Sequence, residues 1–417
     1  MKIALIDGYS TGRVLAEAVR RRGAPAVHVS SADGMPEYFT RGFDPGQYET
    51  CLTADAVMGD AGPPALAERL TALGVTRVVA GTESGVELAD TLTHLMGLPG
   101  HRFETVAARR DKSAMARAVA AAGLAVPRGA DFGDEREAGT WYAASGMTDV
   151  VVKPPRSAGS DNVWFCRTRA EVTWACARVL ASRNLYAERN GAVLVQERLN
   201  GTEYYANSVS HDGLHRVAEL WRYTKRTGSS GRPVYDYELP VPVGDAQGDL
   251  VRRFVPHVLD ALGIVSGAAH TEVMVTARGP VLIESGARPG GATLPWVVEK
   301  YCGVSQTALL ADTLVDPDAL RRFDESDGSA AGPAELRNVA LINHVDAPVR
   351  SLAWEHRLRG LPTLTALSHG AHPDRRLPVT VDLLSSPGYA YLAGTPEEVA
   401  RDYRELRGWE EGGLYTG

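Results

Sequence analysis

Long apolar runs, paired cysteines and a surplus of positive charge are all absent from this sequence. No apolar segment approaches the roughly 18 residues that a membrane-spanning helix needs. The first residues, MKIALIDGYS, predict a buried strand without a secretory cleavage pattern. The cysteines contain no CxxC pair, so we expect reduced core thiols at Cys51, Cys166, Cys176 and Cys302. These absences favour a cytoplasmic protein that does not contact a membrane.

Positive charge is outweighed by negative charge. The chain has 44 Lys and Arg residues against 51 Asp and Glu residues, which gives a formal net charge of −7. A nucleic-acid-binding domain normally carries a basic patch or stripe. Nucleic acid is therefore not an expected partner.

Lysine is scarce, because only five of the 44 basic residues are lysine. Arginine has replaced lysine in most places where either would serve, so a remaining lysine marks a site that needs a compact ammonium instead of a planar guanidinium. Lys112, Lys153 and Lys225 stand in positions that suggest a function, whereas Lys2 and Lys300 resemble ordinary strand-edge and helix-surface residues.

The pattern of strands and helices predicts a multidomain protein of α/β and α+β type, since 417 residues are too many for one ordinary core. Residues 1–100 alternate short apolar runs with amphipathic helices, which predicts a Rossmann-like parallel sheet. The first turn, DGYSTGR, lacks the GxGxxG of a dinucleotide site. Residues 101–325 would form a second domain with a small lobe at about 150–200, and residues 326–417 a C-terminal α+β part that completes its large lobe.

Lys153 ends the predicted buried strand VVVKP, and a run of small residues follows it at once: Ser157, Ala158, Gly159 and Ser160. A loop rich in backbone N–H groups can fold over phosphates. A plain hairpin with a surface lysine is the alternative interpretation.

The segment QERLNGTEYY, residues 196–205, carries Glu197 and Glu203 on either side of a turn at Gly201. Free backbone groups between two strands can bind an adenine edge, and a carboxylate can accept hydrogen bonds from both ribose hydroxyl groups. A hairpin with exposed carboxylates explains this segment equally well by itself.

The segment HTEVMVTARGPVLIESGARPGG, residues 270–291, is the most informative part of the chain. It places Glu272 and Glu284 on what the pattern predicts to be two paired strands, and Arg288 follows the second carboxylate. Hard oxygen ligands beside a guanidinium suit Mg²⁺ and a triphosphate. The glycine pair at the end of the segment lets a ligand approach the backbone closely. The segment therefore predicts phosphoryl transfer from a nucleotide to a carboxylate.

Together these segments resemble the ATP-grasp carboxylate–amine ligases, and more narrowly the L-amino-acid ligase branch that includes the alanine–anticapsin ligase type. The resemblance runs from about Ile3 to the C-terminus. It is carried by RRDKSAM, VVKPPRSAGSDNV, QERLNGTEYY, HTEVMVT and LIESGARPGG. It implies an ATP-grasp domain at 101–325, the use of ATP and Mg²⁺, and, because dimers are common in the family, a homodimer as one expected state.

The resemblance also implies roles for individual residues. Glu272 and Glu284 would hold Mg²⁺, while Arg288 would stabilise the acyl phosphate and then the tetrahedral intermediate, which makes it catalytic together with Lys153. Residues expected to bind ATP are Lys112, Lys153, Ser157, Ser160, Gln196, Glu197, Leu199, Glu203 and Lys225. Residues expected to contact substrate are Glu83, His270, Arg288, Gly290, Gly291, Trp221 and Tyr223.

Two expectations carry stated alternatives, and a third concerns a loop. His270 could take a proton from the attacking amine or orient substrate, or it could be a hydrogen-bonded core histidine. Glu83 could accept a substrate ammonium or could be an ordinary carboxylate at a helix start. The polar stretch Thr224–Tyr237 is expected to be a mobile loop that closes over the site. One departure from the family concerns Gly286, which stands where many ATP-grasp enzymes have Asn.

The predicted function is ATP-dependent amide formation. A small carboxylate, an amino acid or a similar metabolite of a biosynthetic pathway, would be activated as an acyl phosphate and captured by an amine, with release of ADP and phosphate. Transfer of the acyl group to a carrier-protein thiol or a peptide is the alternative acceptor. A nucleotide-binding regulatory protein with an idle site is the alternative from another class.

Overall fold

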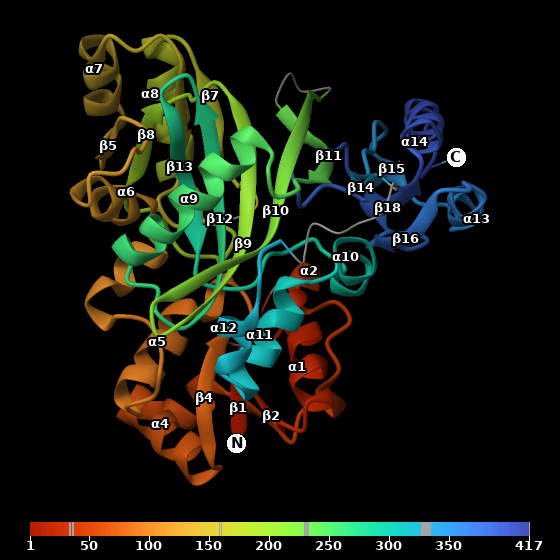
Figure 1. Cartoon of the computed structure of the whole chain (residues 1–417). Coiled ribbons are helices and arrows are strands. Elements are labelled where there is room, and N and C mark those ends of the chain that lie inside the picture. Colours follow the sequence, from red (N-terminus) through yellow and green to blue (C-terminus); the bar gives the residue numbers. More distant parts are fainter. Residues whose placement is uncertain are drawn as a thin grey trace.

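The computed structural model describes residues 1–32, 35, 37–157, 159, 161–228, 233–326 and 335–416. Its main layers are a parallel sheet near the N-terminus, a small antiparallel sheet, and a long antiparallel sheet between them that continues into the C-terminal region. Figure 1 shows the N-terminal sheet at one end of the molecule and the small lobe at the other, with the C-terminal elements beside the long sheet.

The N-terminal layer is the parallel sheet that the sequence predicts. Its strands lie in the order β3-β2-β1-β4, and all pairs are parallel. Ile3, Ala4, Leu5 and Ile6 of β1 are all apolar, as expected for a strand that is buried on both faces. The elements are β1 (Lys2–Ile6), α1 (Thr11–Arg21), β2 (Ala26–Ser30), α2 (Glu37–Thr40), η1 (Pro45–Gln47), β3 (Thr50–Thr53), α3 (Ala54–Met58), η2 (Gly59–Ala61), α4 (Pro63–Ala72), β4 (Val75–Ala80), η3 (Glu83–Gly85) and α5 (Val86–Leu95).

The small lobe is an antiparallel sheet of order β5-β8-β6-β7 with two helices packed together. The turn η4 (Phe103–Arg109) and helix α6 (Lys112–Ala121) lead into it. Its first strand and first helix lie upstream of the segment in which the sequence suggested the lobe. The elements are β5 (Gly129–Phe132), α7 (Glu135–Ser145), β6 (Val150–Lys153), β7 (Trp164–Cys166), α8 (Arg169–Leu180) and β8 (Val193–Glu197).

The long sheet has the order β13-β12-β9-β10-β11-β14-β18-β16 and is antiparallel throughout. Its last three strands come from the C-terminal region, so that region extends the same surface. The strands are β9 (Thr202–His211), β10 (Leu214–Thr227), β11 (Pro233–Pro240), β12 (Gly267–Thr276), β13 (Gly279–Gly286), β14 (Glu335–Ala340), β16 (Leu364–His369) and β18 (Gly388–Gly394).

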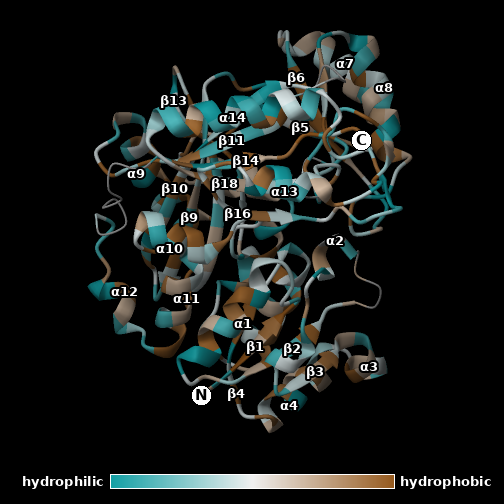
Figure 2. Cartoon of the chain, turned by 90° about the vertical axis from the view of Figure 1, so that its right-hand side faces the viewer, coloured by the Kyte–Doolittle hydropathy of each residue, from teal (hydrophilic) through white to brown (hydrophobic). Residues whose placement is uncertain are grey.

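The remaining elements cover this sheet and join it to its neighbours. One apolar core contains Ile6 of β1, Val86 of α5, Val258 of α9 and Ala287 after β13, so the N-terminal layer and the long sheet share packing. Figure 2 shows apolar residues along β1 and β2 and more hydrophilic ones on outer helices such as α14. The elements are α9 (Ala246–Ala261), α10 (Pro295–Cys302), α11 (Gln306–Val315), α12 (Asp318–Arg322), β15 (Ala347–Pro348), α13 (Ala353–Arg359), β17 (Arg376–Leu377) and α14 (Pro396–Glu411).

One expectation about local structure is wrong, and one alternative interpretation is excluded. Most of Thr224–Tyr237 is not a loop, because β10 and β11 pair along it, from Trp221 opposite Pro240 to Thr227 opposite Pro233. The stretch is polar because its side chains line a cavity, which conceals the usual alternation of a strand. The QERLNGTEYY segment is not a hairpin, since β8 belongs to the small sheet and β9 to the long one.

The expectation of free cysteines in the core holds only in part. All four cysteines are free, but Cys51 is exposed, whereas the others are buried. Within the described ranges, no helix has the length and apolar character that a membrane span requires.

Candidate active site

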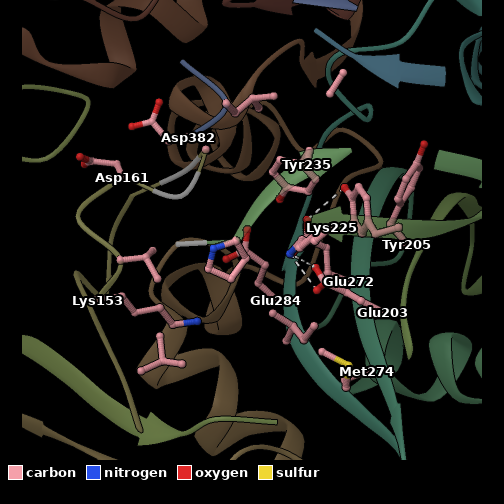
Figure 3. Close-up of a pocket in the computed structure, with 18 of the residues that line it drawn as sticks. Lys153, Asp161, Glu203, Tyr205, Lys225, Tyr235, Glu272, Met274, Glu284 and Asp382 are labelled. Atoms are coloured by element: carbon pink, nitrogen blue, oxygen red, sulfur yellow. Dashed lines mark hydrogen bonds and ion pairs between the residues drawn. The ribbon is translucent and has the colours of Figure 1, made fainter. Parts of the chain in front are cut away.

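A cavity of about 1090 Å³ lies where the small lobe, the long sheet and the C-terminal region meet. It is large for a ligand pocket, and it could hold a nucleotide together with smaller molecules. Most of the residues that the sequence singled out line it: Lys112, Lys153, Ser157, Gln196, Glu197, Leu199, Glu203, Tyr223, Lys225, His270, Glu272, Glu284, Arg288 and Gly291. Figure 3 shows some of them, among them Lys153, Glu203, Lys225, Glu272 and Glu284.

The two proposed metal carboxylates face each other across one strand pair. Glu272 of β12 is paired directly with Glu284 of β13, and on its other side with Tyr205 of β9. Directly opposed side chains of an antiparallel pair have Cβ atoms about 5 Å apart. Hard divalent cations accept such carboxylate oxygens as ligands. Both carboxylates lie at the cavity, so the pair fits a Mg²⁺ ion that is shared with phosphate oxygens.

Lys112 joins the start of α6 to both the carboxylate pair and the small-residue loop. Its Nζ lies 3.0 Å from Glu284 Oε2 and donates a hydrogen bond of 2.6 Å to the carbonyl oxygen of Ser157. Asp111 caps the helix by accepting bonds from the N–H groups of Ser113 and Ala114. The cap defines the first turn of α6 and so fixes the position of the Lys112 backbone. The Lys112 ammonium is therefore a positive group between the carboxylates and the loop.

Lys153, the last residue of β6, approaches the same place from the small lobe. It is 7% exposed. Burial lowers the pKa of Lys153 to about 8; Glu284 opposes the shift, and nearby Lys112 adds to it. An ammonium that is poorly solvated and close to another cation gains strongly from an anionic ligand. Two converging lysines beside two carboxylates are therefore suited to bind a metal-bound polyphosphate.

Glu203 of β9 and Lys225 of β10 form an ion pair beside Glu272 in the same cavity. Lys225 Nζ donates hydrogen bonds of 2.7 and 2.8 Å to the two carboxylate oxygens of Glu203, as Figure 3 shows. The same ammonium lies 4.7 Å from the ring centre of Tyr235 and 5.5 Å from that of Tyr223. Burial would lower the pKa of Lys225, but Tyr235 and Glu203 raise it above its usual value, so Lys225 carries a full charge.

The connection between β8 and β9 joins the small lobe to the long sheet and lines the cavity. Glu197 does not present a free carboxylate there, because Arg278 donates a 2.6 Å bond to its Oε1 and Arg128 donates to both oxygens. Its neighbour Gln196 is buried, and Leu199 lines the cavity. Contacts of this segment with a ligand would therefore use Leu199 and backbone groups more than the Glu197 side chain.

His270 and Tyr223 hold Glu272. The Nδ1 of His270 lies 2.8 Å from Asn207 Oδ1 and its Nε2 lies 3.6 Å from Glu272 Oε1, while Tyr223 Oη donates a 3.3 Å bond to the same oxygen. Burial works against ionisation, but His270, Lys225 and Arg288 together hold the pKa of Glu272 well below its usual range. Glu272 is therefore a carboxylate at every ordinary pH, as a metal ligand must be.

Arg288 is held by Glu83 from the N-terminal layer. Arg288 Nε donates a 3.1 Å bond to Glu83 Oε2, and Arg110 Nη1 lies 3.5 Å from Glu83 Oε1. Burial opposes ionisation of Glu83, yet these two guanidiniums lower its pKa. Gly286 permits the contact, because a Cβ at this position would lie 2.6 Å from Glu83 Oε2. The departure from the family's Asn thus coincides with an arginine that is oriented by Glu83.

Some predicted residues lie elsewhere. Trp221 is buried, and its Nε1–H donates to Glu219 Oε2, so it supports the sheet behind the cavity. Glu83 and Gly290 do not line the cavity; Glu83 pairs with arginines, and the Gly290 N–H donates to Gln306 Oε1. Ser160 lies outside the described residues.

Sequence reasoning missed one polar group of the cavity, at its C-terminal side. Glu238 of β11 accepts a 2.8 Å bond from Tyr205 Oη and a 3.0 Å bond from Asn338 Nδ2. Burial raises the pKa of Glu238 to about 7. Tyr389, Asp382 and other C-terminal residues also line this side. No motif marks Glu238, because its partners Tyr205 and Asn338 come from β9 and β14, far away in the sequence.

Known proteins resemble the chain in sequence and in fold. The ATP-grasp domain family model matches residues 147–295. Dapdiamide A synthase of Enterobacter agglomerans is 31% identical over 387 residues, which are 93% of this chain and 90% of that protein.

Two solved structures show the same fold. The L-amino acid ligase of Bacillus licheniformis has a TM-score of 0.74 at 17% identity, covering 98% of this chain and 97% of the other. The carboxyaminoimidazole ribonucleotide synthase of Aspergillus clavatus, solved with ATP, has a TM-score of 0.69 at 13% identity over 99% and 98% of the two chains. The chain therefore belongs to the ATP-grasp carboxylate–amine ligase family and is an ATP-using, ADP-forming enzyme that makes C–N bonds.

Proposed function

We propose that this ligase joins the carboxylate of one amino acid, or of a similar small metabolite, to the amine of a second, and that it does so with Mg²⁺ in the cavity described above. The observation that carries the proposal is the meeting of Lys112, Lys153, Glu272 and Glu284 at one cavity with Arg288 beside them. The names of the relatives, a dapdiamide synthase and an L-amino acid ligase, support substrates of this size. A carrier-protein thiol is less favoured as acceptor, because both relatives are named for small products or substrates.

The phosphate side of the cavity supplies the charges that phosphoryl transfer needs. When bound, Mg²⁺ would be held by Glu272 and Glu284 and would neutralise charge on phosphate oxygens. Lys112 and Lys153 add two ammonium groups, from α6 and from the end of β6, and Lys112 Nζ also donates to the carbonyl oxygen of Ser157 at the start of the loop. We propose that this loop covers the phosphates, and that residues 101–325 act as the ATP-grasp domain, with residues 1–100 and 326–417 on either side.

Arg288 would act on the acyl group. Its guanidinium is fixed before any ligand arrives, since Glu83 and the carbonyl oxygen of Pro289 both accept bonds from it. A cation held in place stabilises the charge that develops on the acyl phosphate and on the tetrahedral intermediate without reorganisation. Removal of such a group typically reduces turnover by about 10² to 10³.

We propose that His270 orients Glu272 and that its Nε2 accepts a proton at the cavity. Its Nε2 faces Glu272, and its Nδ1 is engaged by Asn207. The attacking amine must lose a proton during amide formation, so we propose that it passes through this part of the cavity.

An ADP-release assay across amino acids, singly and in pairs, with ATP and Mg²⁺, tests the proposed function. We expect release that requires two substrates, and a product whose mass equals their sum minus water. Release of AMP and pyrophosphate, or a product attached to a protein thiol, would contradict the proposal.

A further inference from the structure

Glu238 is a carboxylate at the cavity that the phosphate chemistry does not use. It lies on β11, where its backbone pairs with Tyr223 of β10 on one side and Asn338 of β14 on the other. Along the long sheet, three strand spacings separate β11 from β12, which carries Glu272. At about 4.8 Å for each spacing, the two backbones lie about 14 Å apart. Glu238 thus marks an end of the cavity away from the proposed metal ligands.

The contacts of Glu238 leave acceptor capacity unused. Both of its hydrogen bonds, from Tyr205 Oη and Asn338 Nδ2, reach Oε2. In the part of the chain that the structure describes, Oε1 has no hydrogen-bond donor and no Lys, Arg or His nitrogen within ion-pair distance. Asn338 is 4% exposed, yet its Oδ1 also has no described partner. Glu238 Oε1 is therefore an available acceptor, whereas Asn338 Oδ1 is enclosed by the protein.

The titratable groups around Glu238 do not neutralise the negative charge of its carboxylate. The titratable groups that act on it most strongly, or that it influences most, are Tyr205, Tyr223, Tyr389, Tyr391, Glu219 and Glu272, which are phenols and carboxylates. A buried carboxylate with hydrogen-bond donors but no cation is stabilised strongly by a cation that a ligand brings. The rings of Tyr205 and Trp221 stack with their centres 6.2 Å apart and their planes at an angle of 5°. This wall of the cavity is therefore held in place before a ligand binds.

We propose that Glu238 Oε1 forms a subsite for the ammonium group of an amino-acid substrate. This inference rests on the proposed function, because it assigns part of the same cavity to one of the two substrates. An ammonium has three N–H donors, so one of them can satisfy Oε1 while it also carries the positive charge that this carboxylate lacks. Tyr205 and the Nδ2 of Asn338 orient the carboxylate by holding Oε2.

The test compares the wild type with Glu238→Gln, which keeps the shape of the side chain and mimics a protonated carboxyl group. In one assay hydroxylamine, a neutral nucleophile, replaces the amine substrate, and hydroxamate formation measures the KM of the amino-acid donor alone. In the other assay the best amino-acid pair is used, and the KM of the acceptor is measured. The matched control is Glu335→Gln, since Glu335 pairs with Arg337 on β14 and does not line the cavity.

We expect Glu238→Gln to raise the KM of one substrate about 10-fold to 100-fold, as for loss of a hydrogen bond to a charged group. The KM of ATP and the thermal midpoint should remain near wild type. A rise for the donor in the hydroxylamine assay assigns the ammonium to the donor. A rise only for the amino-acid acceptor assigns it to the acceptor.

Two results would overturn the account in different ways. If Glu238→Gln changes neither KM by more than about twofold while the wild type is active, Glu238 is a neutral structural group and the subsite is wrong. If the wild type itself forms neither hydroxamate nor ADP with any amino-acid donor, the proposed function fails, and the subsite that rests on it fails as well.

Discussion

Gly286 leaves room for the carboxylate of Glu83, which comes from the N-terminal layer and holds the catalytic candidate Arg288. A Cβ at Gly286 would lie 2.6 Å from Glu83 Oε2, while Arg288 Nε donates a 3.1 Å bond to the same oxygen. The residue that departs from the common ATP-grasp pattern is thus the one that lets a distant segment orient the arginine.

Gly286→Ala should therefore reduce activity without unfolding the protein. The added methyl group displaces Glu83, and Arg288 loses its orientation. Since a misplacement of about 1 Å can cost about 10²-fold in rate, we expect kcat/KM to fall by at least tenfold. Gly133→Ala is the control, because a Cβ there meets nothing within 4 Å. Wild-type kcat/KM in Gly286→Ala would show that the Glu83 contact does not position Arg288.

Glu284→Gln should abolish turnover and leave the fold intact. The neutral amide is a poor ligand for a hard cation, and it also removes the partner of Lys112, whose Nζ lies 3.0 Å from Glu284 Oε2. We expect ADP release at saturating Mg²⁺ to fall by at least about 10²-fold, with an unchanged circular dichroism spectrum. Glu405→Gln on the exposed face of α14 serves as the control. Activity within tenfold of wild type would show that Glu284 does not bind the metal.

The affinity for ATP should fall at alkaline pH because of Lys153. Burial lowers the pKa of this ammonium to about 8 in the free enzyme, so the group becomes neutral as the pH rises through that value. If only the charged form binds phosphate, the KM of ATP increases about tenfold for each pH unit above 8. Steady-state kinetics between pH 7 and 9.5 measure this. A constant KM over the range would mean that Lys153 does not titrate there or does not contact the phosphates.

The fold should depend strongly on Arg407 of α14. Its Nη2 lies 2.7 Å from Asp236 Oδ1 of β11, and its Nη1 pairs with Glu410, which is fully buried. Arg407→Met leaves these acidic groups without their cation, which typically costs about 3–5 kcal/mol of unfolding free energy. Arg404→Met on the exposed side of the same helix should cost little. Equal denaturation midpoints for the two variants would contradict this role.

The sequence predicted the parts of the site that lie within single motifs. The spacing of Glu272 and Glu284 predicted a strand pair, and the two residues are directly opposed in it. The scarcity of lysine marked Lys112, Lys153 and Lys225, and all three line the cavity. These predictions succeed because each depends on local periodicity or on one choice of residue type.

The parts that the sequence did not predict arise from contacts between distant segments. Glu238 and Asn338 meet through strand pairing across 100 positions of the chain, and Glu83 meets Arg288 across 205. The β10–β11 hairpin was mistaken for a loop because cavity-facing side chains are polar on a strand that would otherwise alternate. The register between strands that are far apart in the sequence depends on how their side chains pack. A single sequence does not show that packing.

An isotope experiment tests the central claim, formation of an acyl phosphate from ATP, most directly. The donor amino acid is labelled with ¹⁸O in both carboxylate oxygens, and the products of one round of ligation are analysed by mass spectrometry. One oxygen attacks the γ-phosphorus, and the amine then displaces phosphate from the carbonyl carbon. The account predicts one ¹⁸O in the released phosphate and one in the amide carbonyl. Phosphate without ¹⁸O, or ¹⁸O in AMP, would contradict it.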